Sequence, residues 1–340
     1  MAQEYGFFLL QWVTVLVGLA LVVAIIIGGI QRARMQGEPE GKLSIKDLSA
    51  RLKRRRHQIE RALLPDRKAL RSWRKQQKQQ QKDDKAKPHT EQARVWVIDF
   101  KGDIQASATA ELTEVVSALL EVAKPGDTVL LRLESPGGVV PGYGLAAAQL
   151  LRLKDQKLRL WITVDKVAAS GGYMMACVAD RIYAAPFAVV GSIGVVAQLP
   201  NFNRLLKKND IDVELHTAGE HKRSLTVFGE NTKAGRAHFK QQLSAIHDLF
   251  KQHVARARPQ LDIDQVADGN YWFGEHALAH GLVDELRTSD DVLRDLAKTH
   301  RVLQLSFVTP KTLQMKLAQG AAEGVLQLFD RLQTRFKGFG

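Results

Sequence analysis

The chain has 340 residues, of which 45% are hydrophobic and 25% are charged, and its formal net charge is +13. This apolar content is enough for one large folded domain or two modest ones, and it excludes a chain that is disordered throughout. The single cysteine, Cys177, excludes a disulfide within the chain, and we expect it to be a small buried hydrophobe.

The first predicted element is a membrane span at residues 7–30. This stretch, FFLLQWVTVLVGLALVVAIIIGGI, carries no charge and is longer than the roughly 20 residues that a helix needs to cross a bilayer. Only Glu4 is charged in the tail at residues 1–6, and no small-residue cleavage site follows the span, so the segment does not resemble a secretory signal peptide. We expect residues 7–30 to remain as an anchor.

The basic charge is concentrated in a predicted linker at residues 31–91. These residues hold 19 Lys and Arg against 8 Asp and Glu, so the rest of the chain is nearly neutral. A helical or disordered linker of this kind suits anionic lipid headgroups, near which each Lys or Arg contributes about 1 kcal/mol. Nucleic acid is not expected as a partner, because Trp73 is the one aromatic residue available for stacking on bases.

The charges beside the span also predict its orientation. Basic residues follow the span at Arg32, Arg34, Lys42 and Lys46, and none precedes it. The positive-inside rule therefore directs the folded domain toward the cytoplasm.

A folded domain is predicted at residues 92–300, beginning with the strand RVWVIDF at 94–100. The following elements alternate between helix and strand: helix 108–124, strand 128–134, loop 135–144, helix 145–154, strand 158–166, helix 168–179 and strand 181–186. Nearly continuous apolar strands separated by helices predict an α/β fold whose parallel sheet is covered on both faces. A long helix is expected at 233–257, and an amphipathic extension at 301–340 completes the chain.

Two glycine-containing loops follow neighbouring strands of this predicted sheet. The motif ESPGG at 134–138 lies at the carboxyl end of its strand, where open parallel sheets bind ligands. Ser170 follows the next strand, so the two loops are expected to meet. The N–H groups of Gly138 and Gly171 would then be placed to stabilise an oxyanion. Turn formation by Pro and Gly, and a buried structural serine, are the simpler explanations of the two motifs.

A nucleophilic serine needs a base, because its hydroxyl reacts weakly at neutral pH. Most histidines lie in the linker, in the long polar helix or far downstream, and only His216 and His221 lie on a predicted loop near the sheet. Lys222 lies in the same loop, and the charge of the adjacent Arg223 would favour its neutral amine. The residues themselves leave these three candidates open.

Five stretches of the chain together resemble the signal peptide peptidase A family of serine peptidases, in its single-repeat form. They are VAASGGYMMACVAD, the SPGG loop, AAPFAVVGSIGVV, AGEHKRSLT and GEHALAHGLVDEL. Their order and spacing agree with the family, and the resemblance extends from the predicted anchor to about residue 290. It implies a crotonase-like α/β fold, related to the proteolytic subunits of the Clp type, and an endopeptidase that needs no cofactor or metal.

The resemblance also implies roles for individual residues. Ser170 corresponds to the nucleophile and Lys222 to the general base, while Ser192 corresponds to a serine that positions the lysine amine. Gly138 and Gly171 correspond to the oxyanion donors, and Gly137 shapes their loop. The chain departs from many relatives in having Glu134 and Ser135 before the Pro-Gly-Gly run.

Assembly, substrates and location follow from the same resemblance. It implies a ring of subunits in which Lys222 reaches the serine of a neighbour, in the bacterial inner membrane, acting on apolar or signal-peptide-like segments. Relatives in this family work on the outer face of that membrane, whereas the charge rule favours the cytoplasmic face, so the side of the peptidase domain stays open. The aromatic run Tyr271, Trp272 and Phe273 is expected in the core or in a subunit contact.

Two alternative functions use the same fold. A crotonase-like acyl-CoA enzyme would need neither Ser170 nor Lys222, and a non-catalytic membrane scaffold would keep the fold for assembly alone. Asp284 and Glu285 are expected to be structural, because adjacent strand residues point to opposite faces. No His, Cys and carboxylate cluster has the spacing of a metal site.

Overall fold

The computed structural model describes residues 41–86, 93–219 and 222–308. Its contacts place Ser44–Ser306 in one compact unit. The predicted span at 7–30 and most of the extension at 301–340 lie outside the described residues. Among the helices that are described, none has both the length and the apolar character needed to cross a bilayer.

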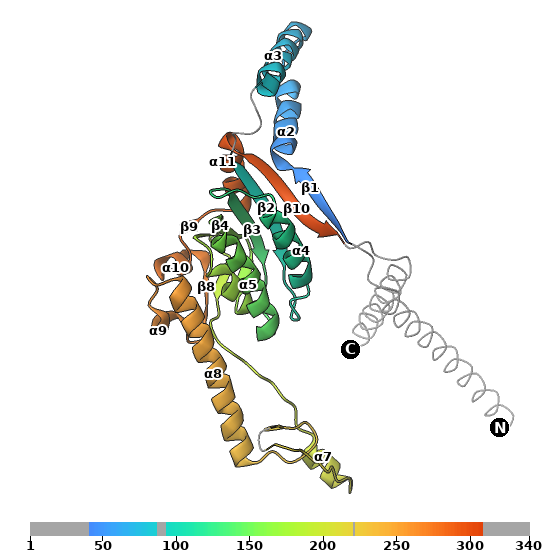
Figure 1. The fold of residues 1–340 in the computed structure, drawn as a ribbon, viewed down its shortest axis with the longest axis vertical. Coiled ribbons are helices and arrows are strands. Elements are labelled where there is room, and N and C mark those ends of the chain that lie inside the picture. The colour runs from blue at the N-terminus through green and yellow to red at the C-terminus, as the bar shows by residue number, and fades with distance from the viewer. Residues whose placement is uncertain (1–40, 87–92, 220–221, 309–340) are drawn as a thin grey trace, which may run out of the picture. The chain divides into compact units, whose positions relative to one another are not determined.

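Two sheets form the framework (Figure 1). The larger sheet has the strand order β1-β10-β2-β3-β4-β6-β9, and the smaller has the order β5-β7-β8. The strands are β1 (Lys42–Asp47), β2 (Arg94–Lys101), β3 (Thr128–Glu134), β4 (Arg159–Val164), β5 (Val167–Ala169), β6 (Arg181–Ala184), β7 (Val189–Gly191), β8 (Tyr271–Phe273), β9 (Glu285–Leu286) and β10 (Arg301–Val308).

Helices separate most of these strands along the chain. They are α2 (Leu48–Ala62), α3 (Arg67–Ala86), α4 (Thr109–Leu120), α5 (Val140–Asp155), α6 (Gly171–Ala176), α7 (Asn203–Lys208), α8 (Lys233–Ala257), α9 (Ile263–Val266), α10 (Gly274–Ala279) and α11 (Ser289–Thr299). The predicted linker at 31–91 is helical over α2 and α3, but its residues 42–47 form β1 and join the large sheet, which was not predicted. The long helix predicted at 233–257 is confirmed as α8.

The predicted parallel arrangement is confirmed for the centre of the large sheet. β10, β2, β3, β4, β6 and β9 pair with one another in parallel. The apolar run of β2 is buried along Val95–Ile98, as expected of a strand covered on both faces. The smaller sheet differs from the prediction, because β7 and β8 pair antiparallel. β10 also extends the large sheet past residue 300.

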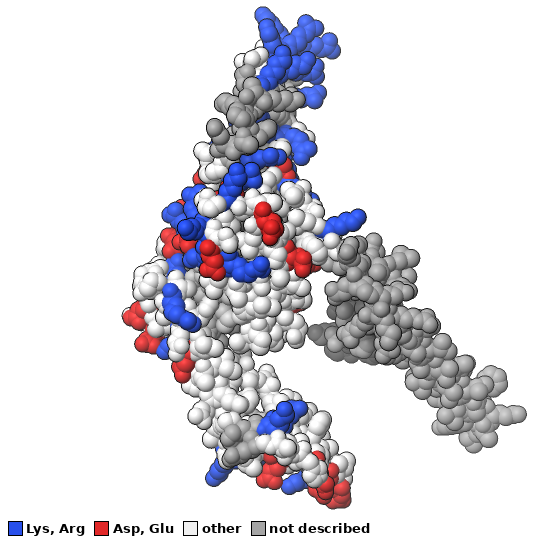
Figure 2. Space-filling view, in the orientation of Figure 1, with Lys and Arg blue, Asp and Glu red and all other residues white. Residues whose placement is uncertain are grey.

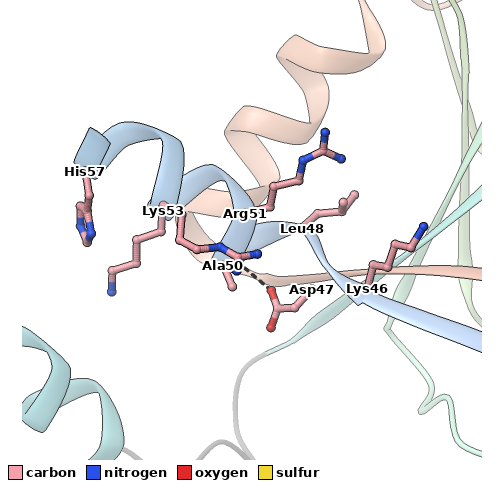
Figure 3. Close-up of a pocket in the computed structure, with 8 residues that line it drawn as sticks. Lys46, Asp47, Leu48, Ala50, Arg51, Lys53 and His57 are labelled. Carbon is pink, nitrogen blue, oxygen red and sulfur yellow. Dashed lines mark hydrogen bonds between the residues drawn. The ribbon is translucent and has the colours of Figure 1, made fainter. Parts of the chain in front are cut away.

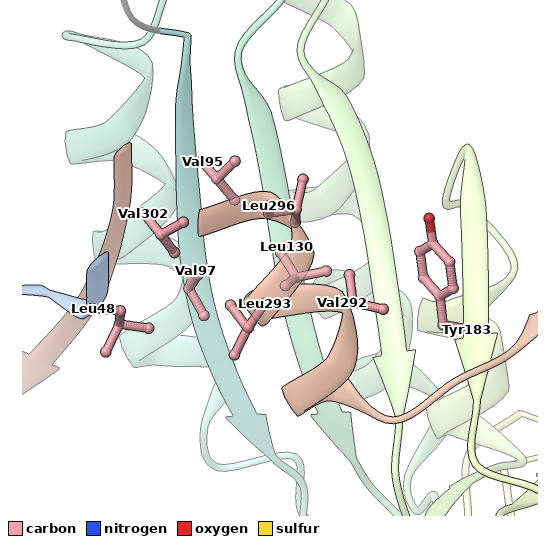
Figure 4. Packing of buried hydrophobic residues seen from close by; sticks show 9 residues of the cluster. All are labelled: Leu48, Val95, Val97, Leu130, Tyr183, Val292, Leu293, Leu296 and Val302. Atoms are coloured by element: carbon pink, nitrogen blue, oxygen red, sulfur yellow. The ribbon is translucent and has the colours of Figure 1, made fainter. Parts of the chain in front are cut away.

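One face of the large sheet packs against α11 (Figure 4). Val292, Leu293 and Leu296 follow a helical spacing, so all three lie on the side of α11 that meets the strands. The cluster consists of Leu48, Val95, Val97, Leu130, Tyr183, Val292, Leu293, Leu296 and Val302. Among the other helices, α5 packs against both α4 and α6.

Two helices begin at places that the sequence did not predict. α5 begins at Val140 and not at Leu145, because Pro141 occupies its first turn, where the missing N–H is not needed. The helix expected at 168–179 is divided into β5 and α6 by Ser170, whose φ of 52° interrupts regular structure.

We predict that Leu130→Ala lowers the free energy of unfolding by about 2–5 kcal/mol, because Leu130 is fully buried in the sheet and its removal leaves a cavity. Leu145→Ala is the matched control, since Leu145 is exposed on α5 and should change stability by less than about 0.5 kcal/mol. Urea unfolding followed by tryptophan fluorescence measures both. Equal effects of the two substitutions would contradict the core described above.

Candidate active site

The loops after β3 and β5 meet, as the sequence predicted. The Ser135 N–H donates to the Val167 carbonyl over 2.8 Å, and the Ala169 N–H donates back to the Ser135 carbonyl over 3.0 Å. These two bonds form a parallel bridge between Ser135 and Ala168. They bring the SPGG motif directly against the chain at Ser170.

Gly137 is the point of closest approach between the loops. Its φ is 91°, a conformation that favours glycine. A Cβ added there would lie 2.7 Å from both the Ser170 Cβ and the Ala169 carbonyl oxygen. Any side chain at position 137 would therefore push the two loops apart.

Two backbone N–H groups beside Ser170 are free to bind a ligand. Within the described residues, neither Gly138 nor Gly171 donates its N–H to a hydrogen-bond acceptor. A Cβ on Gly138 would overlap the Ile104 carbonyl, and one on Gly171 would overlap the Tyr143 ring. Both positions therefore require glycine, and both leave an amide available.

Ser170 has a strained backbone at the junction of β5 and α6. Its φ of 52° and ψ of −118° are unusual for a residue with a side chain and cost about 1–3 kcal/mol. Its N–H donates to the Gly191 carbonyl over 2.8 Å, and its own carbonyl accepts from the Met174 N–H over 3.0 Å. This turn lets a half-buried serine stand at the start of a buried helix.

Ser192 lies directly after the residue that holds Ser170. Its φ is also 52°, and its N–H donates to the Asn270 carbonyl over 2.8 Å. Its hydroxyl donates to the Gly269 carbonyl over 3.3 Å. Within the part of the chain that the structure describes, its hydroxyl has no bond to Lys222.

A buried hydrogen-bond chain beneath the SPGG loop was missed by sequence reasoning. The Tyr143 hydroxyl donates to the Asp103 carbonyl over 2.8 Å, so the Ser135 hydroxyl must donate to Tyr143 over 2.6 Å. The Gly137 N–H then donates to the Ser135 hydroxyl over 3.1 Å. Burial raises the pKa of Tyr143, which keeps its hydroxyl protonated. This chain fixes the loop from below.

A small hollow lies beside Ser170. Its other walls come from the SPGG loop, the start of α5, α6, the chain after β7 and the middle of α8. They are Gly138, Val140, Gly171, Met174, Gly194, Val195, Ile246 and Phe250. Its volume is about 10 Å³, which is about the space of one water molecule. The contribution of α8 could not be predicted from the sequence, because Ile246 and Phe250 lie more than 70 residues after Ser170.

Two histidines of α8 lie nearer to the site than the sequence indicated. The His247 Nε2 lies 3.2 Å from the Ile193 carbonyl, and the His253 Nε2 lies 3.0 Å from the Met174 carbonyl. A nitrogen bonded to a carbonyl must carry a proton. These two Nε2 atoms therefore cannot take the serine proton.

Lys222 is not brought to Ser170 within the chain. It is exposed, and its segment bonds mainly to itself, as between the Phe202 N–H and the Val227 carbonyl over 2.8 Å. The Ser224 carbonyl lies against Gly235 at the start of α8, whereas the hollow at Ser170 touches Ile246. At 1.5 Å per residue, these two points of α8 are about 16 Å apart. Figure 1 shows α8 connecting α7 at one end to α9 at the other.

His216, one of the two candidate loop histidines, does not complete the site either. His216 is exposed and lies 3.2 Å from Glu214, and His221 lies outside the described residues. The structure thus brings together Ser170, Gly137, Gly138 and Gly171, and neither Lys222 nor His216 lines the hollow at Ser170.

The acidic pair near the end of the domain binds arginines. Asp284 accepts two bonds of 2.8 and 2.9 Å from the buried Arg258, while Glu285 pairs with Arg181 over 3.0 Å. Burial alone would raise the pKa of Asp284, but the bond from Arg258 lowers it below the ordinary value. Burial raises the pKa of Cys177 to about 12, which fits a structural thiol. Among the described side chains, no group of three metal-binding residues is suitably placed.

Comparisons with known proteins identify the family of the chain. The model of Peptidase family S49 matches residues 152–303, and that of Peptidase family S49 N-terminal matches residues 1–150. The "Probable protease SohB" of Haemophilus influenzae is 48% identical over 341 residues, covering 97% of this chain and 96% of the relative. A protein of the same description from Buchnera aphidicola subsp. Acyrthosiphon pisum is 50% identical over 240 residues, covering 69% of this chain and 71% of that protein.

A solved structure is also similar, at a lower level. A mutant of the 1510-N membrane-bound stomatin-specific protease, in complex with a substrate peptide, has 14% sequence identity and a TM-score of 0.44. The similarity covers 68% of this chain and 99% of that protein. The sequence matches, which together span nearly the whole chain, confirm the resemblance inferred from the motifs: the chain belongs to peptidase family S49.

Proposed function

We propose that the protein is a serine endopeptidase in which Ser170 is the nucleophile and Lys222 the general base. Membership of a peptidase family supports cleavage of peptide bonds. The observation that carries the assignment is the strained Ser170 beside the two free N–H groups of Gly138 and Gly171. This arrangement offers a nucleophile and an oxyanion site within one pair of loops.

The reaction proceeds in two stages. The Ser170 Oγ attacks the scissile carbonyl carbon while its proton passes to the neutral Lys222 amine. The carbonyl oxygen becomes an oxyanion held by the N–H groups of Gly138 and Gly171, each worth about 2.7–4 kcal/mol in such sites. The tetrahedral intermediate collapses, and Lys222 protonates the leaving amine. Water, activated by Lys222, then hydrolyses the acyl-enzyme, and Ser192 holds the lysine amine in position.

Assembly supplies the base in this proposal. Because Lys222 lies about one half of α8 away from its own Ser170, we propose that it acts on the serine of a neighbouring subunit in a ring. Exposed apolar side chains accompany Lys222 on its segment, among them Leu205, Val213 and Phe228. Tyr271 and Phe273 are exposed on β8 as well. Subunit contacts would bury these side chains and complete each site.

The proposed substrates are apolar or signal-peptide-like segments near a membrane. Val140, Met174, Val195, Ile246 and Phe250 give the hollow beside Ser170 an apolar lining, which suits a small or aliphatic substrate side chain. The hollow must widen before such a side chain can enter. We also propose that residues 7–30 anchor the protein in the bacterial inner membrane, with the charge rule directing the peptidase unit toward the cytoplasm.

We predict that Ser170→Ala and Lys222→Ala each reduce peptide hydrolysis by about 10³-fold or more, because they remove the nucleophile and its base. Lys208→Ala is the control, since it removes another exposed lysine from the neighbouring α7. Hydrolysis of a fluorogenic apolar peptide measures activity, and a fluorophosphonate probe should label Ser170 alone. Retained activity in Lys222→Ala with lost activity in His216→Ala would refute the dyad. An acyl-CoA enzyme or a scaffold would not be labelled at Ser170.

We predict that two inactive variants restore each other's activity when mixed. In a ring with freely exchanging subunits, equal amounts of Ser170→Ala and Lys222→Ala should leave about a quarter of all sites intact, because each such site needs Ser170 from one variant and Lys222 from the other. The experiment is done with the full chain in detergent, before and after subunit exchange. A site contained within one chain would give no recovery, and that result would reject the shared site while leaving the dyad intact.

We predict that the rate rises toward alkaline pH, because a lysine acts as a base only in its neutral form. The measurement is kcat/KM for the fluorogenic peptide at several pH values with constant ionic strength. A rate that is independent of pH from about 6 to 10 would argue against a lysine base.

A further inference from the structure

Helix α2 exposes a stripe of aliphatic side chains. Leu52, Ile59 and Leu63 are 36%, 64% and 77% exposed, although side chains of this kind are usually buried. Their spacings of seven and four residues place them on one side of the helix, Leu63 being the residue that caps it. Leu48 at the start of the helix is the residue that packs into the domain core.

Arginines occupy much of the remaining surface of the helix: Arg55 lies beside the stripe, Arg51 lies about a quarter turn from it, and Arg54 lies on the opposite side. Arg51, Arg54 and Arg55 are exposed and, within the described residues, have no acidic partner. Arg56 is paired with Glu60 over 2.6 Å. Figure 2 shows the Lys and Arg side chains gathered over α2 and α3. An aliphatic stripe bordered by arginines is the composition of a helix that lies in a membrane interface.

A hollow at the start of α2 adds a place for an anionic group (Figure 3). Its volume is about 500 Å³, and all of its lining residues come from the stretch 46–57, so it is an open hollow along the surface of the helix. Four of its eight lining residues are cationic, namely Lys46, Arg51, Lys53 and Arg54. The one acidic residue, Asp47, is already bound to the Ala50 N–H over 2.8 Å and to Arg301 over 3.2 Å.

The same features distinguish a lipid surface from nucleic acid. Proteins that bind single-stranded nucleic acid use aromatic rings for stacking, and aliphatic side chains do not serve this purpose. The Trp73 ring packs edge-on against His57 at 5.6 Å, and its Nε1 donates to Glu60 over 3.3 Å. Trp73 of α3 therefore makes its contacts with α2. Aliphatic side chains can instead enter the boundary between headgroups and acyl chains.

The helix is also within reach of the proposed anchor. Residues 31–45 separate the span at 7–30 from the hollow, and a chain of that length covers at most about 55 Å. The bilayer surface is therefore close to α2 if residues 7–30 cross the membrane.

We propose that α2 lies along the surface of an anionic bilayer. Leu52, Ile59 and Leu63 enter the interface, and the cations of α2 and its hollow bind phosphate groups of the lipids. α2 is joined to the peptidase unit by Leu48 in the core and by the Val302 N–H, which donates to the Ser49 hydroxyl over 2.9 Å. Contact of α2 with lipid therefore sets how the unit faces the membrane. The proposal rests on the anchor in the proposed function.

The test compares two labelled positions in the full chain. Ile59→Cys lies on the aliphatic stripe, whereas Gln58→Cys is turned by about 100° around the helix and is also exposed. Cys177 is buried and does not compete for the label. Each variant, carrying an environment-sensitive nitrobenzoxadiazole, is placed in nanodiscs with lipid-borne quenchers, with or without about one third phosphatidylglycerol.

We expect quenching at position 59 to exceed that at position 58 by at least about twofold in discs containing phosphatidylglycerol. The triple variant Arg51→Gln, Arg54→Gln, Arg55→Gln should lose most of this difference. A control with equal charge removed elsewhere, Lys208→Gln, Arg236→Gln, Lys240→Gln, should keep it. Equal quenching at the two positions, or no dependence on phosphatidylglycerol, would overturn the proposal.

The same samples also distinguish failure of the anchor, and binding of nucleic acid, from failure of this proposal. Retention of the protein on neutral discs reports the anchor, and quenching in anionic discs reports α2, so failure of the anchor is distinguished from failure of this proposal. Tighter binding of a single-stranded RNA oligonucleotide than of anionic discs, abolished in the arginine triple variant, would overturn the proposal in favour of nucleic acid.

Discussion

The close approach of two backbone turns, at Gly137 and Ser170, is the constraint on which the site depends. Backbone bonds between Ser135 and the chain at Val167–Ala169 hold the turns together, and the Ser170 N–H is fixed to Gly191. The residues that make these bonds lie at or next to the ends of β3, β5 and β7. The position of the hydroxyl is therefore set by the parallel sheet, and the side chains around it are free to define specificity.

The sequence predicted the parts of the fold that arise from local patterns. The apolar runs of β2, β3 and β4 and the polar periodicity of α8 were sufficient to place these elements. The meeting of the two loops followed from a general property of parallel sheets, whose strand ends lie at one edge. The roles of Ser192 and Lys222, by contrast, came from the family motifs and remain proposals.

The remaining features depend on contacts between distant residues. Ile246 and Phe250 reach the hollow because α8 packs against α6, and no local pattern indicates this packing. The bond between Ser135 and Tyr143 depends on the exact start of α5, which the sequence placed five residues too late. The antiparallel pairing of β7 with β8 joins segments 80 residues apart, which periodicity cannot detect.

Helix α8 has a consequence for the way the proposed assembly would work. Its 25 residues form a rod of about 37 Å, whose middle closes the hollow at Ser170 and whose first turn holds the segment that carries Lys222. If α8 moves as a rigid rod, displacement of Phe250 by an entering substrate would shift the first turn of the same helix. In a ring with shared sites, that start belongs to the next site, so occupation of one site would alter its neighbour and hydrolysis would show cooperativity.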